Sequence, residues 1–72
     1  MDYINVTIKR IGSQTIDYTA APGITVQEVL TANNINSTGS EVRLNGVRVN
    51  LDAPINNNSE LFISKAIAGA TN

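Results

Sequence analysis

The sequence predicts a single α+β domain of ββαββ type, in which one helix covers one face of a mixed sheet. Residues 3–10 and 14–20 alternate apolar and polar side chains, a pattern typical of half-buried strands. The spacing of apolar residues changes to that of a helix at Thr25, and Asn45-Gly46 lies between two further alternating segments. The chain has 72 residues, enough for one domain, and 42% of them are hydrophobic, as in globular chains.

The first two strands are expected to form a hairpin. Gly12-Ser13 interrupts the alternation and supplies the turn. Pro22-Gly23 ends the second strand, because proline provides no N–H group for the ladder and glycine accepts positive φ. Both strands direct apolar side chains towards one core: Ile4, Val6, Ile8, Ile16 and Tyr18.

A short helix of about two turns follows this hairpin. Thr25 and Glu28 have the spacing of a capping box, in which each side chain accepts a hydrogen bond from the other residue's backbone N–H. Asn33-Asn34 is expected to end the helix, because asparagine tolerates the left-handed conformation of a helix C-terminus. So short a helix must pack on the sheet to persist, through an apolar stripe made by Val26, Val29, Leu30 and Ile35.

The second hairpin, over 41–49, is predicted by its Asn-Gly pair, which is typical of a type I′ turn. A two-residue turn sets the register, so that Leu44 faces Val47 and Arg43 faces Arg48. The segment after it, as far as Pro54, is expected to be irregular, with the Ile55 side chain under the sheet. Four aliphatic residues are expected on the inner face: Val42, Leu44, Val47 and Val49.

A last strand is expected over 60–66, with Leu61 and Ile63 facing the core and Phe62 facing outward. The residues that follow have small side chains and are expected to fray. The prediction is therefore one domain over 1–67 and a flexible tail over 68–72.

The composition excludes several kinds of chemistry. The chain has no Cys and no His, which excludes disulfides, thiol chemistry, cysteine or histidine metal sites and histidine acid–base catalysis. No spacing forces two of the six acidic residues together, and the five glycines are isolated turn residues rather than a phosphate-binding loop. We therefore expect no catalytic residues, no cofactor and no metal, and a protein that is not an enzyme.

Charge and hydropathy limit the partners and the location. The net charge of −1, from five Lys and Arg against six Asp and Glu, does not favour nucleic acid binding. No apolar segment approaches the roughly 18 residues of a membrane span, and no signal peptide is recognisable. A cytoplasmic protein with a protein partner is the expectation.

Three segments together with the order of elements resemble the ubiquitin-like β-grasp family, and most closely its small sulfur carriers of thiamine and molybdopterin synthesis. They are the helix start Ala21-Pro22-Gly23-Ile24-Thr25-Val26-Gln27-Glu28-Val29-Leu30, the hairpin Leu44-Asn45-Gly46-Val47, and the end Glu60-Leu61-Phe62-Ile63-Ser64-Lys65-Ala66-Ile67-Ala68-Gly69. The resemblance covers nearly the whole chain. It implies that the first and last strands lie parallel and adjacent at the centre of the sheet.

The C-terminus departs from that family. The resemblance implies a terminal glycine carboxylate that an activating enzyme adenylates, and that then becomes a thiocarboxylate or an isopeptide bond. Here the chain ends Ala68-Gly69-Ala70-Thr71-Asn72, so Ala68 replaces the first glycine and three residues follow the second. Either a protease trims the chain after Gly69, or the carrier chemistry is absent.

The expected function is that of a non-catalytic ubiquitin-like module that binds a partner protein through the outer face of its sheet, the usual partner surface of ubiquitin-like proteins, and activation at Gly69 after trimming is the alternative. Phe62, the chain's one phenylalanine, would lie there among cations, as in a protein-docking patch. The alternative is that there is no docking patch: Phe62 is then an ordinary exposed apolar residue, and Glu41 neutralises the arginines. The candidate partner-binding residues are Phe62, Arg43, Arg48 and Lys9.

Overall fold

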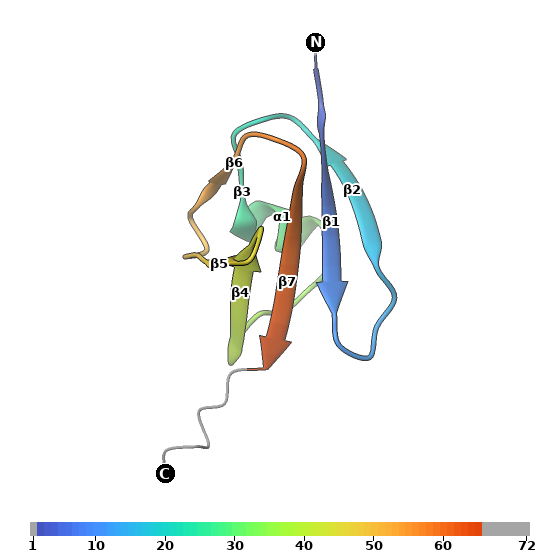
Figure 1. Cartoon of the computed structure of the whole chain (residues 1–72), viewed down its shortest axis with the longest axis vertical. Coiled ribbons are helices and arrows are strands. Elements are labelled where there is room, and N and C mark those ends of the chain that lie inside the picture. The colour runs from blue at the N-terminus through green and yellow to red at the C-terminus, as the bar shows by residue number, and fades with distance from the viewer. Residues whose placement is uncertain (1, 66–72) are drawn as a thin grey trace.

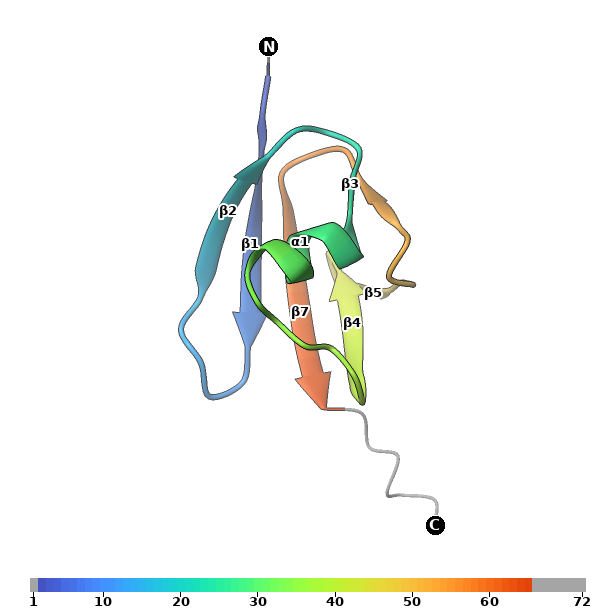
Figure 2. The ribbon, with the colours of Figure 1, turned by 180° about the vertical axis from the view of Figure 1, so that it is seen from behind.

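The computed structural model describes residues 2–65, and these form a sheet with one helix packed on its inner face (Figures 1 and 2). The expected tail over 68–72, and the domain boundary at 67, lie outside the described residues. The elements in chain order are β1 (Ile4–Arg10), β2 (Ile16–Ala20), β3 (Ile24–Thr25), α1 (Val26–Ala32), β4 (Ser40–Leu44), β5 (Val47–Arg48), β6 (Pro54–Ile55) and β7 (Ser59–Lys65).

The main sheet has five strands in the order β2-β1-β7-β4-β5 (Figure 1). The last strand, β7, runs parallel to β1 on one side and antiparallel to β4 on the other. All other neighbouring strands of this sheet are antiparallel. The predicted mixed sheet, with the first and last strands parallel and adjacent at its centre, is confirmed.

Alternation in β1 and β7 builds the centre of the core. Val6 and Ile8 of β1 are fully buried, and so is Leu61 of β7, which lies in register with Ile8. In β2, Ile16 and Tyr18 are half-buried and pack against the core, because β2 is the outermost strand on its side. The core cluster consists of Ile4, Val6, Ile8, Val26, Val29, Leu30, Ile35, Val42, Ile55, Leu61 and Ile63.

Helix α1 begins and ends as its sequence predicts. The Thr25 Oγ1 accepts a hydrogen bond from the Glu28 backbone N–H at 3.1 Å, and a Glu28 carboxylate oxygen accepts one from the Thr25 N–H at 2.9 Å. At the other end Asn34 adopts a left-handed φ of 57°. The Ile35 N–H then donates to the Leu30 carbonyl at 2.9 Å, which returns the chain to the core in a Schellman motif.

The β4–β5 hairpin has the predicted turn and register. Asn45 and Gly46 have φ of 52° and 86°, as a type I′ turn requires, and Leu44 pairs with Val47. The expected burial of Val47 is wrong, because its side chain is 65% exposed. The pairing places it on the predicted face, but β5 is an edge strand of only two residues, so little of the protein surrounds it.

The structure adds a small second sheet that sequence patterns did not predict. Strands β3 and β6 pair antiparallel, with Ile24 opposite Ile55 and Thr25 opposite Pro54. The segment before β6, expected to be irregular, also accepts hydrogen bonds at the helix start: the Gln27 N–H donates to the Leu51 carbonyl at 2.8 Å. This segment satisfies helix donors and places the fully buried Ile55 under the sheet.

Candidate functional site

The four candidate partner-binding residues lie in one row across the outer face of the main sheet. Phe62 of β7 is in register with Lys9 of β1 on one side and with Arg43 of β4 on the other. Arg43 is in turn in register with Arg48 of β5. Register partners share a face, and the core residues Ile8, Leu61 and Val42, which adjoin members of this row along their strands, lie on the opposite face. We call this row, Lys9–Phe62–Arg43–Arg48, the outer row.

Phe62 is half-buried rather than exposed. Its two register neighbours, Lys9 and Arg43, carry long aliphatic stems on the same face, and each side chain is 47% exposed. Phe62 is therefore the one half-buried residue of the row, and the three exposed residues of the row are cations. Sequence reasoning placed Phe62 on the correct face and overestimated its exposure, because alternation assigns a face and does not count neighbours.

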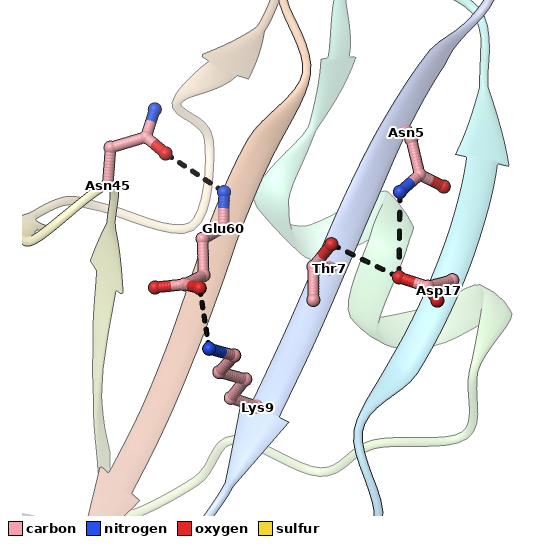
Figure 3. Close-up of polar contacts among 6 residues, drawn as sticks. All are labelled: Asn5, Thr7, Lys9, Asp17, Asn45 and Glu60. Carbon is pink, nitrogen blue, oxygen red and sulfur yellow. Dashed lines mark hydrogen bonds and ion pairs between the residues drawn. The ribbon is translucent and has the colours of Figure 1, made fainter.

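The expected cationic rim is partly neutralised, and Figure 3 shows one of the two pairs, Lys9 with Glu60. The Lys9 Nζ lies 2.8 Å from a Glu60 carboxylate oxygen, and the Arg43 Nε donates to a Glu41 carboxylate oxygen at 2.7 Å. Arg48 has no acidic partner among residues 2–65. Exposed ion pairs of this kind contribute little to stability. Their main effect is to hold the charged groups in position on the outer face.

Asn45 joins the β4–β5 turn to β7, a role that sequence reasoning did not find. Its side-chain Oδ1 accepts a hydrogen bond from the Glu60 N–H at 2.9 Å (Figure 3). Its own backbone N–H donates to the Glu60 carbonyl at 2.8 Å. The turn is thereby held beside the start of β7. The Asn-Gly pair indicated the turn, but no local pattern shows that its asparagine faces a strand 15 residues away.

A polar group lies on the other side of the face, over β1 and β2. One Asp17 carboxylate oxygen accepts hydrogen bonds from the Thr7 hydroxyl at 3.1 Å and from the Asn5 amide at 3.5 Å (Figure 3). Thr7 and Asp17 are register partners, which explains their proximity. The outer face thus carries the outer row across β1, β7, β4 and β5, and a separate group of hydrogen-bonded polar side chains over β1 and β2.

Two further findings concern residues 2–65 alone. Within them, no three acidic side chains gather closely enough to hold a metal ion. The one helix of this part of the chain is too short to cross a membrane. Gly69, the candidate activation site, lies outside the described residues.

No protein-family model and no curated protein matches the sequence. Among solved structures, the ubiquitin of Caldiarchaeum subterraneum is similar, with a TM-score of 0.66 over 94% of this chain and 99% of that one. The two sequences are 11% identical, so the likeness concerns the fold and does not separate sulfur carriers from other branches of the family. Residues 2–65 contain one helix and a five-stranded mixed sheet with parallel central strands, and the chain has the ubiquitin-like β-grasp fold.

Proposed function

We propose that this protein is a non-catalytic ubiquitin-like module that binds a partner protein through the outer face of its sheet, in the cytoplasm. The observation that carries the proposal is the outer row itself: four strands bring one aromatic and three cationic side chains into a single register line. Aromatic residues and arginine are enriched at protein interfaces, where a rigid apolar centre is surrounded by polar groups.

The charges of the row suggest the chemistry of the partner. Lys9 and Arg43 already have carboxylates beside them, whereas Arg48 has none among the described residues. A complementary surface would therefore carry an apolar side chain to meet Phe62 and a carboxylate to meet Arg48. Rim charges of this kind influence association rate and specificity more than they influence affinity.

The test uses charge reversal at the two arginines of the row. After capture of the partner by cross-linking to the immobilised protein, we expect Arg48→Glu to slow association more than Arg43→Glu does. The reason is that Arg43 is paired with Glu41, so part of its field is cancelled before the partner arrives.

Stopped-flow association rates over a range of salt concentrations check this prediction. The difference between the two variants should shrink as salt rises, because salt screens exposed charges. Equal association rates for wild type and both variants at low salt would count against the outer face as the docking surface.

A second candidate function is that of a carrier or modifier activated at Gly69 after trimming. The likeness of fold to a ubiquitin supports it, as does the presence of a glycine close to the C-terminus. The activation chemistry requires a terminal glycine, because a narrow channel in an adenylating enzyme does not pass a Cβ. Intact mass from the native source separates the two functions: loss of Ala70-Thr71-Asn72 supports the carrier, and a full-length chain supports the binding module.

We expect the full-length chain not to be adenylated by a cognate activating enzyme in the presence of ATP. A chain shortened to end at Gly69 should react, at a rate reduced by the Cβ of Ala68, and the Ala68→Gly version of the short chain should react faster. Pyrophosphate exchange measures all three. Adenylation of the full-length chain would contradict the need for trimming, and no reaction of either short chain would exclude the carrier function.

A further inference from the structure

A pocket of about 350 Å³ lies at the end of the sheet where β1 and β7 finish, apart from the outer row. Its walls are the ends of β1 and β7, the first residue of β4, and the segment that follows α1. In Figure 2 this segment runs from the helix down to the start of β4, in front of the sheet. The pocket therefore belongs to the inner face, beyond the end of the short helix.

The alternation of the strands brings two cations to this inner face. Arg10 follows Ile4, Val6 and Ile8 in the inward series of β1, and it is in register with the buried Ile63. Lys65 continues the inward series of β7 after Ile63. Both line the pocket, together with the hydroxyl-bearing Ser13, Ser40 and Ser64, and the lining contains no acidic residue.

Within residues 2–65, no ion pair joins Arg10 or Lys65 to a carboxylate. The Arg10 Nε is buried and has no hydrogen-bond acceptor in this part of the chain. Buried donors are nearly always satisfied, and leaving a charged group's donor without an acceptor is especially unfavourable. A guanidinium in this condition is suited to a carboxylate, which binds arginine through two parallel hydrogen bonds after a small rotation of the side chain.

The rest of the lining is aliphatic. Ile35 and Ile63 are buried and form the base of the pocket, while Ile11 at its rim is 78% exposed, the highest value among the large hydrophobic residues described. An aliphatic side chain that is this exposed, beside a cationic pocket, offers a contact surface for an apolar group of a ligand. The volume is near the lower limit for small-molecule pockets, so one or two side chains fill it.

We propose that this pocket binds an acidic peptide segment of a partner protein, in which a carboxylate side chain lies next to an aliphatic residue. The carboxylate meets Arg10 and Lys65, and the aliphatic side chain packs on Ile11, Ile35 and Ile63. The charge of the lining, two cations without an acid, selects this chemistry over a basic or neutral peptide. The proposal does not rest on the outer-face function, because the two surfaces lie on opposite faces of the sheet.

The test titrates the full-length protein with the peptide acetyl-glycyl-leucyl-aspartyl-leucyl-glycine amide, followed through the backbone amide signals in two-dimensional NMR. We expect the shifted signals to be those of Ile11, Ile35 and Ser64. The same peptide with asparagine in place of aspartate should bind at least about tenfold more weakly, since it lacks the charge.

Arg10→Met keeps the length of the stem and removes the guanidinium, so it should weaken binding of the acidic peptide by at least about tenfold. Gln27→Met places the same side chain at an exposed position of α1, outside both the pocket and the outer row, and serves as the control, with unchanged affinity expected. Lys65→Met provides a second variant if Arg10→Met unfolds, and should also weaken binding.

Three results would overturn the proposal: no peptide-dependent shifts, equal affinity for the acidic and the amide peptide, or shifts confined to the outer row. The last result would leave the outer-face function standing. Conversely, the peptide could bind in the pocket while the outer-row variants associate normally with the captured partner. That combination would exclude the outer-face function and support the pocket proposal.

Discussion

Replacing Leu61 with alanine is expected to destabilise the protein by about 2–5 kcal/mol, the range for deleting a buried leucine side chain. Leu61 is fully buried, and it lies between Ile8 of β1 and Leu44 of β4 in the register of the sheet. The loss combines the transfer energy of the removed methyl and methylene groups with the cavity that remains, because the strands on both sides prevent the site from collapsing. For a small domain, with a total stability of about 0.05–0.15 kcal/mol per residue, this is a large fraction.

Urea denaturation followed by circular dichroism measures the effect of this substitution. Leu61→Met should cost less than about 1.5 kcal/mol, since it nearly conserves volume. Val47→Ala should change the free energy of unfolding by no more than about 0.5 kcal/mol, because Val47 is exposed. If Leu61→Ala unfolds at the urea concentration of the wild type, β7 does not lie at the centre of the core.

Replacing Phe62 with alanine is expected to weaken binding of the outer-face partner by about 2 kcal/mol or more, as for an aromatic anchor at the centre of an interface. Phe62 is the one aromatic residue of the outer row, and a cation lies in register with it on each neighbouring strand. Its removal leaves Lys9 and Arg43 with no apolar surface between them. The partner then loses the contact that excludes water from the centre of the interface.

Isothermal titration against the captured partner measures this loss. Because Phe62 is half-buried, a thermal denaturation curve of the variant is needed to show that the fold persists at the temperature of the titration. Tyr3→Ala is the matched control: it removes an aromatic ring that is 62% exposed and precedes β1, about 20 Å from Lys9 at the rise of a strand. Full affinity of the Phe62→Ala variant would refute the outer row as a docking surface.

The sequence determined every feature that depends on residues close together in the chain. The capping box at Thr25 and Glu28 and the left-handed Asn34 follow from side chains within one or two turns of the helix ends. The register of the β4–β5 hairpin follows from a two-residue turn. The faces of β1 and β7 follow from a period of two residues. Each is local, and local preferences can be read without knowing the rest of the fold.

The parallel pairing of β1 with β7 followed from a different source. Its residues are about 50 positions apart, with Val6 opposite Ser59, and no local pattern specifies it. Similarity to the β-grasp family predicted it instead, and the structure confirmed it. The β3–β6 pair was not predicted by either route, because two-residue strands carry too little periodicity to be seen.

Only the tertiary structure decided exposure, pairing of charges and the location of the pocket. Alternation placed Val47 with the core residues, yet it is exposed, because β5 is an edge strand, whereas Leu61 and Ile8 in the same register line are fully buried under the centre of the sheet. At the end of the sheet where β1 and β7 finish, Arg10 and Lys65 line an open pocket. Sequence patterns assign a side chain to a face, but what covers that face depends on the lengths and positions of elements brought together from the whole chain.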